Sequence, residues 1–203
     1  MIYPDLQDNI DRLQDFEISK ERKEILKPLI AYIQQKVDTN EPFSLNYICT
    51  HNSRRSQFAQ VWSQVAAAIH NIEVESFSGG VEVTAFNKRA IYSLTRFGFQ
   101  VSIHGVDNPK YTIRFSDLID PIISFSKLFD DDVNPSASFA AVMTCSHADE
   151  NCPFIPGADQ RIALNYEDPK AFDDTEQETE KYDERSDQIG SELLYAFSQI
   201  RKS

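Results

Sequence analysis

The hydrophobic residues of this chain recur at two spacings, one typical of helices and one typical of buried strands. Apolar side chains lie three or four positions apart, with charged residues between them, in a first segment that ends at Glu41-Pro42. Helical spacing therefore predicts helices over residues 1–40, 55–70, 84–97 and 177–200. Short apolar runs predict strands over residues 44–49, 72–78, 139–145 and 161–165.

The alternation of strands and helices indicates the fold class. Strands separated by helices form parallel βαβ units with right-handed crossovers. We therefore expect one α/β domain over residues 44–203, with a four-stranded, mainly parallel sheet flanked by helices. Residues 1–43 precede the first core strand and form an N-terminal helical extension.

Residues 104–136 follow neither spacing. Three prolines, each after an Asn or Asp, divide this segment into short pieces: Asn108-Pro109, Asp120-Pro121 and Asn134-Pro135. The segment fits a lid or an added hairpin beside the functional pocket, and it fits equally well a surface insertion with no chemistry.

Composition narrows the classes of partner. The chain has 203 residues and a net charge of −12, which argues against nucleic acid and against anionic membrane surfaces. No apolar run approaches the roughly 20 residues of a membrane-spanning helix. The first residues, Met1-Ile-Tyr-Pro-Asp, have neither the basic nor the apolar region of a signal peptide. Free thiols in such a chain point to the cytoplasm.

One short loop carries the strongest chemical signal. Cys49 follows the apolar run 45–48, and Arg55 comes six positions later, where a helix should begin. Loop N–H groups that converge at a helix N-terminus bind a tetrahedral oxyanion, and the same field favours the thiolate form of a cysteine. The arginine adds a planar fork that matches two oxygens of phosphate or arsenate. The alternative is a buried cysteine at a strand end beside a solvated basic patch.

The other two cysteines, Cys145 and Cys152, follow the apolar run 139–144 and are separated by six residues. That spacing is poor for zinc, even with His147 as an added ligand, so we expect no metal site. A structural disulfide does not suit a chain without a secretory signal. A relay of three thiols remains, in which a second thiol attacks the first adduct and a third resolves it as a disulfide. The alternative is a buried strand-end thiol and a loop thiol without chemistry.

The loop resembles the signature of the low-molecular-weight protein tyrosine phosphatase superfamily, Cys-x-x-Asn-x-x-Arg-Ser. Within that superfamily it is most similar to the thioredoxin-coupled arsenate reductases, and the likeness extends to Gln57 and to Cys152-Pro153. The resemblance covers roughly residues 44–200 and implies no cofactor. The matching positions are Cys49, Thr50, Asn52, Ser53, Arg55 and Ser56.

Outside these positions, the sequence matches the family at one residue and departs from it at several others. Asp168, just before Pro169, matches the general acid of the family, but the aromatic residues that usually follow it in the phosphatases are absent. His51 stands where the family usually has glycine, which tolerates positive φ, and Arg54 where a small residue or cysteine is usual. Some relatives bind potassium near the loop through a glutamate. Gln60 stands at that position, so we expect no such ion.

The resemblance implies arsenate reduction as the leading function. Arsenate would be held by the loop 50–56 with Arg55 as its clamp, attacked by Cys49 and protonated by Asp168. Cys145 would then attack the adduct and Cys152 would resolve it, leaving a 145–152 disulfide for a thioredoxin-type reductant. The alternative is a phosphatase that hydrolyses phosphoesters through a Cys49 phosphocysteine. A third hypothesis is an oxyanion-binding module without turnover.

Overall fold

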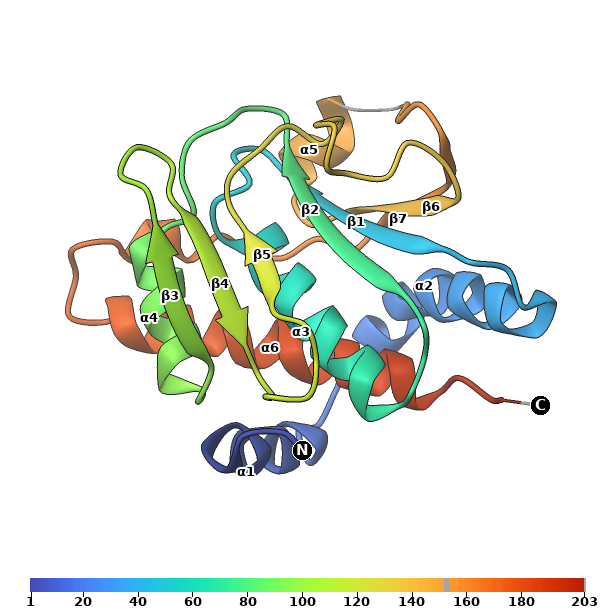
Figure 1. Ribbon diagram of the computed structural model, residues 1–203, viewed down its shortest axis with the longest axis horizontal. Helices are drawn as coiled ribbons and strands as arrows, with labels where there is room; N and C mark the ends of the chain where they lie inside the picture. Colours follow the sequence, from blue (N-terminus) through green and yellow to red (C-terminus); the bar gives the residue numbers. More distant parts are fainter. Residues whose placement is uncertain (152–153, 203) are drawn as a thin grey trace.

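The computed structural model describes residues 1–151 and 154–202 of the chain (Figure 1). Its centre is a parallel four-stranded sheet in the order β2-β1-β6-β7. This arrangement confirms the expected fold class. The strands are β1 (Ser44–Cys49), β2 (Glu75–Gly80), β6 (Phe139–Met143) and β7 (Ala158–Ala163).

Two layers of apolar contacts enclose this sheet, because successive side chains of each strand point to opposite faces. Leu45 and Tyr47 of β1 belong to the main core, whereas Ile48 belongs to a smaller core on the other face. The helix α3 (Arg55–Ile69) packs on the main-core face against β1 and β2, and α6 (Glu178–Ser198) packs on α3. The short helix α5 (Ser146–Asn151) contacts β1 and β6.

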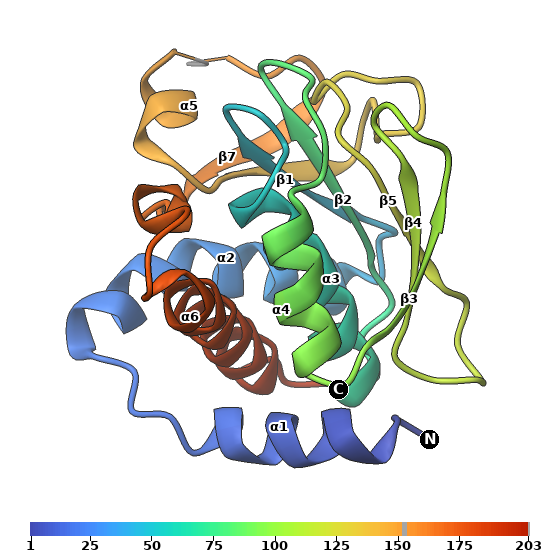
Figure 2. The same cartoon turned by 90° about the vertical axis from the view of Figure 1, so that its left-hand side faces the viewer.

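The N-terminal extension consists of two helices, α1 (Pro4–Gln14) and α2 (Lys20–Thr39). Pro4 begins α1, where its missing N–H costs nothing, and the Ser19 side chain caps α2 by accepting from the Arg22 N–H. Figure 2 shows α1 lying across α6 and α4 (Lys88–Arg96). The apolar stripes of both helices are part of the main core: Leu6, Ile10, Leu13, Leu26, Leu29 and Ile33.

The segment without clear periodicity forms a second sheet. It is antiparallel and consists of β3 (Gln100–His104), β4 (Lys110–Arg114) and β5 (Ile122–Ser124). After β5 the chain runs beside the end of β2, where Gly80 N–H donates to the Lys127 carbonyl. The insertion therefore begins at residue 100, four residues earlier than the sequence pattern indicates, and covers the free edge of β2 near its carboxyl end.

Three of the expected elements have other bounds in the structure. The strand placed at 72–78 runs from Glu75 to Gly80, and the strand placed at 161–165 begins at Ala158. The helix placed at 84–97 begins only at Lys88, because Asn87 caps it by accepting from the Arg89 N–H. Phe86 is nevertheless buried, as expected, although it precedes the helix.

Across the described ranges, 1–151 and 154–202, no helix has both the length and the apolar character needed to cross a membrane.

Candidate active site

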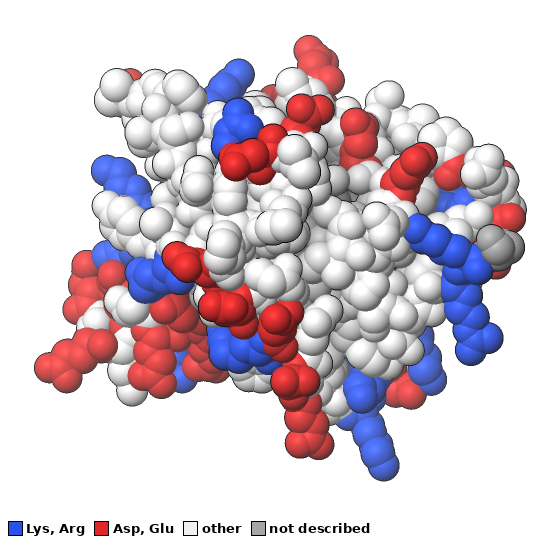
Figure 3. All heavy atoms as spheres, turned by 60° about the horizontal axis from the view of Figure 1, so that its bottom comes forward, with Lys and Arg blue, Asp and Glu red and all other residues white. Residues whose placement is uncertain are grey.

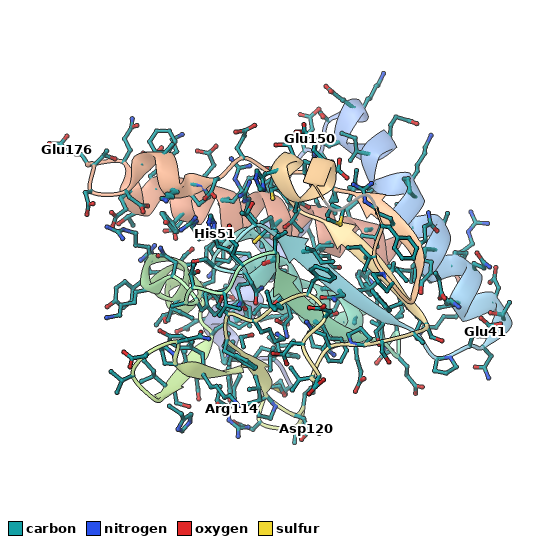
Figure 4. The ribbon with its side chains drawn as sticks, turned by 90° about the horizontal axis from the view of Figure 1, so that it is seen from above. Glu41, His51, Arg114, Asp120, Glu150 and Glu176 are labelled. Atoms are coloured by element: carbon teal, nitrogen blue, oxygen red, sulfur yellow. The ribbon has the colours of Figure 1, made fainter. Side chains whose placement is uncertain are left out.

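The loop after β1 lies at the carboxyl end of the sheet. Cys49 is the last residue of β1 and is only 3% exposed, and residues 50–54 connect it to α3. His51, on this loop, lies between α4 and α5 when the molecule is seen from above (Figure 4). Carboxyl ends of parallel strands are the edge where α/β folds bind ligands.

Every carbonyl of this loop accepts a hydrogen bond from the surrounding structure. The Thr50 carbonyl accepts from the Glu82 N–H at 2.8 Å, and the Ser53 carbonyl from the Asn87 N–H at 2.9 Å. The His51 carbonyl accepts from the Ser126 hydroxyl at 2.9 Å. The remaining two acceptors are the Asn52 carbonyl, bonded by the Gln57 side chain, and the Arg54 carbonyl, bonded by the Phe58 N–H within α3. The peptide groups are thus held with their oxygens turned outward.

The N–H groups of the same loop have no such partners. Within the part of the chain that the structure describes, the backbone N–H groups of residues 51–55 donate to no acceptor. They lie at the N-terminus of the 15-residue helix α3, whose dipole adds positive potential. Unpaired donors at a helix N-terminus form an anion-binding cradle, and residues 50–56 are called the cradle below.

Asn52 holds the cradle in shape. It is fully buried with φ of 46°, a left-handed conformation that asparagine tolerates better than most residues. Its side-chain amide donates to Ser56 Oγ at 2.9 Å, and Ser56 Oγ lies 3.0 Å from Cys49 Sγ. Because Ser56 Oγ accepts from Asn52, its own proton is free to bond the sulfur and to stabilise a thiolate. His51 has no positive φ, so histidine in place of glycine causes no strain there.

The insertion anchors the cradle from outside, which the sequence did not indicate. The Lys127 N–H donates to Asn52 Oδ1 at 3.0 Å and thereby fixes the orientation of that amide. The Gln57 amide bridges the Asn52 and Phe125 carbonyls at 3.0 Å each. No local motif marks residues 125–127, because their contribution is made mainly by backbone groups.

Gly80 lies opposite Cys49 in the register of β1 and β2, and a side chain there would collide with the cradle. A Cβ atom would sit 2.8 Å from Asn52 N and 2.9 Å from Thr50 O. We expect Gly80→Ala to destabilise the fold by about 1–3 kcal/mol through overpacking. Displacement of the cradle should lower turnover by about 100-fold. Urea unfolding and steady-state assays measure the two effects, and wild-type turnover in this variant would contradict the role given to Gly80.

Asp168 lies beside the cradle and holds both arginines. Its carboxylate accepts from Arg54 Nε at 2.7 Å and Nη2 at 3.2 Å, and from Arg55 Nη2 at 2.8 Å. Arg55 Nη1 also donates to the Tyr166 carbonyl at 3.0 Å. The sequence thus assigned Asp168, Arg54 and Arg55 to one site but gave no sign that Asp168 pairs with both arginines. The role of Arg55 as a clamp on the oxyanion stays a prediction.

These contacts change the acidity of Asp168. Burial by itself would raise the pKa of this carboxyl. The hydrogen bond from Arg54 and the charges of Arg55 and Arg54 together outweigh burial, so the pKa of Asp168 lies below its ordinary value. The same pairing outweighs the cost of burying Arg54 and raises the pKa of its guanidinium.

Cys145 shares the smaller core with Cys49. Cys145 is 1% exposed, and its sulfur accepts from the Ala148 N–H at 3.4 Å and lies 3.5 Å from the Thr50 hydroxyl. Thr50 Oγ1 also lies 3.3 Å from Nδ1 of His147, a contact that the sequence pattern did not indicate. The structure thus brings the expected second thiol against the cradle. The expected third thiol, Cys152, lies outside the described residues.

No group of three or more His, Cys, Asp or Glu side chains that could hold a metal ion is found among the described residues.

Comparisons with known proteins identify relatives of this chain. No protein-family model matches the chain. Arsenate reductase 2 of Staphylococcus epidermidis is 32% identical over 126 residues, which span 62% of this chain and 78% of that protein. The arsenate reductase of Staphylococcus aureus strain Newman is 33% identical over 128 residues, with the same two coverages of 62% and 78%.

Two solved structures share the fold. The low-molecular-weight phosphotyrosine phosphatase of Vibrio cholerae O395 superposes with a TM-score of 0.54 at 12% identity, covering 77% of this chain and 95% of that one. An arsenate reductase in the reduced state superposes with a TM-score of 0.50 at 16% identity, covering 78% of this chain and 99% of that one. At such identities the likeness shows the fold alone, whereas the curated relatives show the family. The chain therefore belongs to the family of these arsenate reductases, and it shares its fold with the low-molecular-weight phosphotyrosine phosphatase.

Proposed function

We propose that this protein reduces arsenate to arsenite through a relay of Cys49, Cys145 and Cys152. The observation that carries the proposal is the set of unpaired N–H groups of residues 51–55 around the end of β1, where Cys49 lies. The curated relatives named arsenate reductase support this choice of oxyanion.

The first step joins sulfur to arsenic. Arsenate binds to the cradle N–H groups and to Arg55, which turns from Asp168 to the oxyanion. The Cys49 thiolate attacks arsenic, an As–O bond breaks, and Asp168 supplies the proton with which the departing oxygen leaves as water. Ser56 donates to the sulfur before the attack, and Asn52 keeps Ser56 in place.

The second step reduces arsenic. Cys145 as thiolate attacks Cys49 Sγ, an S–S bond forms, and the electron pair of the S–As bond passes to arsenic, which leaves as arsenite. Thr50 supports this step, because its hydroxyl lies within contact distance of Cys145 Sγ. Cys152 then attacks Cys145, frees the Cys49 thiolate and leaves a 145–152 disulfide.

A dithiol protein of the thioredoxin type completes the cycle by reducing that disulfide. A relay that must return to three free thiols requires a reducing compartment, so we place the protein in the cytoplasm. Cys49 and Cys145 are free thiols in the structure, as the starting state of the relay requires.

Cys152→Ser tests the relay. We expect this variant to complete no more than one arsenate turnover per molecule, because the Cys49–Cys145 disulfide has no resolving thiol. Hydrolysis of an aryl phosphate, which uses only Cys49, Arg55 and Asp168, should persist and serves as the control for folding. Arsenite release is measured with a thioredoxin system present, and alkylated thiols are counted by mass spectrometry. Sustained arsenate turnover would disprove the relay.

A second candidate function is hydrolysis of phosphomonoesters. The position of Asp168 beside both cradle arginines favours it, since an acid is needed there to protonate an ester oxygen. Cys49 would attack phosphorus, and water would hydrolyse the phosphocysteine. The third hypothesis, a binding module, predicts that phosphate binds while neither arsenate nor aryl phosphate is turned over.

A further inference from the structure

A hollow of about 680 Å³ adjoins the cradle. Its walls are formed by His51, Ser53 and Arg54 of the cradle, the segment 84–89, the connection between β3 and β4, and Lys170. A tetrahedral oxyanion is held by the cradle alone. The adjoining space therefore suits a substrate with an organic group attached to the oxyanion.

The charge of this hollow is opposite to that of the molecule. Four cationic side chains line it: Arg54, Lys88, Arg89 and Lys170. No Asp or Glu lines it among the described residues, although the chain has 32 acidic and 20 basic residues. Figure 3 shows acidic side chains gathered on a neighbouring face, at the side where Figure 1 places the start of α6.

Two of the four cations are already paired. Arg54 is held by Asp168, and Arg89 is held by acidic residues of the segment 173–178. Lys88 and Lys170 are exposed and make no ion pair with any residue that the structure describes. Cations without partners at the rim of a hollow attract an anionic group of a ligand.

Part of the remaining wall of the hollow is apolar. Phe86 and Tyr111 are buried in its wall, in edge-to-face contact with ring centroids 5.5 Å apart. Val106, in the connection between β3 and β4, lines the hollow and is 89% exposed. Apolar walls with cations at the rim suit a flat or aliphatic group that ends in a carboxylate.

We propose that this hollow binds the organic part of a phosphomonoester that carries a carboxylate, and that the inserted β3–β4 connection selects this substrate. The inference rests on the second candidate function and adds the substrate class to it. Cys49 attacks phosphorus, the P–O ester bond breaks, and Asp168 protonates the departing alcohol oxygen. Water then attacks phosphorus, releasing inorganic phosphate and the Cys49 thiolate.

Binding measured by calorimetry on the Cys49→Ser protein tests the inference without turnover. The probes are para-carboxymethylphenyl phosphate and para-ethylphenyl phosphate, which are similar in size and leaving group, with inorganic phosphate as the reference for the cradle. We expect the carboxylate probe to bind at least about threefold more tightly, a ratio typical of a solvent-accessible ion pair. Adding Lys88→Glu or Val106→Asp should remove this preference and leave phosphate binding unchanged. Lys27→Glu changes the net charge as much as Lys88→Glu does, at a position outside this hollow, and should preserve the preference.

Each outcome decides between the proposals. Equal binding of the two esters, with phosphate bound, overturns the inference and leaves the cradle intact. A preference that survives both Lys88→Glu and Val106→Asp also overturns it, because the carboxylate would then be held elsewhere. Failure of inorganic phosphate itself to bind would overturn the proposed function, and the inference with it.

Discussion

Replacing Cys49 with serine is expected to lower arsenate reduction and aryl phosphate hydrolysis by about 10⁴-fold or more. A serine hydroxyl scarcely ionises at neutral pH, and the hydrogen bond from Ser56 cannot compensate for that difference. The two residues are similar in size, so the buried position should tolerate the change. Steady-state assays of both reactions measure the loss.

Two controls separate chemistry from folding. Inorganic phosphate should still bind to Cys49→Ser, because the backbone N–H groups of residues 51–55 are unchanged. Cys145→Ser should lose arsenate reduction but keep aryl phosphate hydrolysis, since the second thiol takes no part in ester cleavage. Undiminished hydrolysis by Cys49→Ser would show that the nucleophile lies elsewhere.

Asp168→Asn is expected to lower hydrolysis of esters with poor leaving groups by about 10²–10⁴-fold, the contribution typical of a general acid. An amide cannot donate the required proton, although it keeps the shape of the side chain. Esters with good leaving groups, such as para-nitrophenyl phosphate, should lose much less. A loss that is equal across leaving groups would indicate that Asp168 orders the arginines and does not transfer a proton.

We expect Arg54 to set the pH at which Asp168 acts as the acid. The acid must be protonated for the first step, and its lowered pKa makes hydrolysis fall as pH rises through that pKa. Arg54→Ala removes the hydrogen bond that lowers the pKa most, so the fall should move to higher pH. Arg54→Lys keeps the positive charge, so in this variant the pH at which hydrolysis falls should move less. A pH profile of kcat/KM that is identical in all three proteins would exclude this coupling.

The same pairing links stability to pH. Because the folded-state pKa of Asp168 lies below its ordinary value, the ionised carboxylate stabilises the fold above the unfolded-state pKa of about 3.9. This stabilisation is lost as pH falls through the folded-state pKa. Through its hydrogen bond to Asp168, Arg54 is therefore expected both to stabilise the fold and to lower the pKa of the acid.

The sequence by itself determined the parts that depend on neighbouring residues. Helical and strand periodicities identified the four parallel strands and the helices at both ends of the chain. The spacing of Cys49, Asn52 and Arg55 was sufficient to place a cradle between a strand and a helix, because a loop of this length has few ways to connect them. Periodicity did not indicate that α4 begins at Lys88, since buried Phe86 continues the apolar pattern before the helix begins.

Only the tertiary structure decided which distant groups complete the site. Arg54 and Asp168 are 114 positions apart and meet only because the loop after β7 returns to the cradle. Lys127 N–H and the Phe125 carbonyl support Asn52 and Gln57 through backbone atoms, which every residue carries and no sequence pattern distinguishes. The cationic hollow likewise depends on β3 and β4 folding back beside residues 84–89. The spacing of apolar residues indicates whether a segment is a helix or a strand. Contacts between elements depend on how the whole core packs, which that spacing does not indicate.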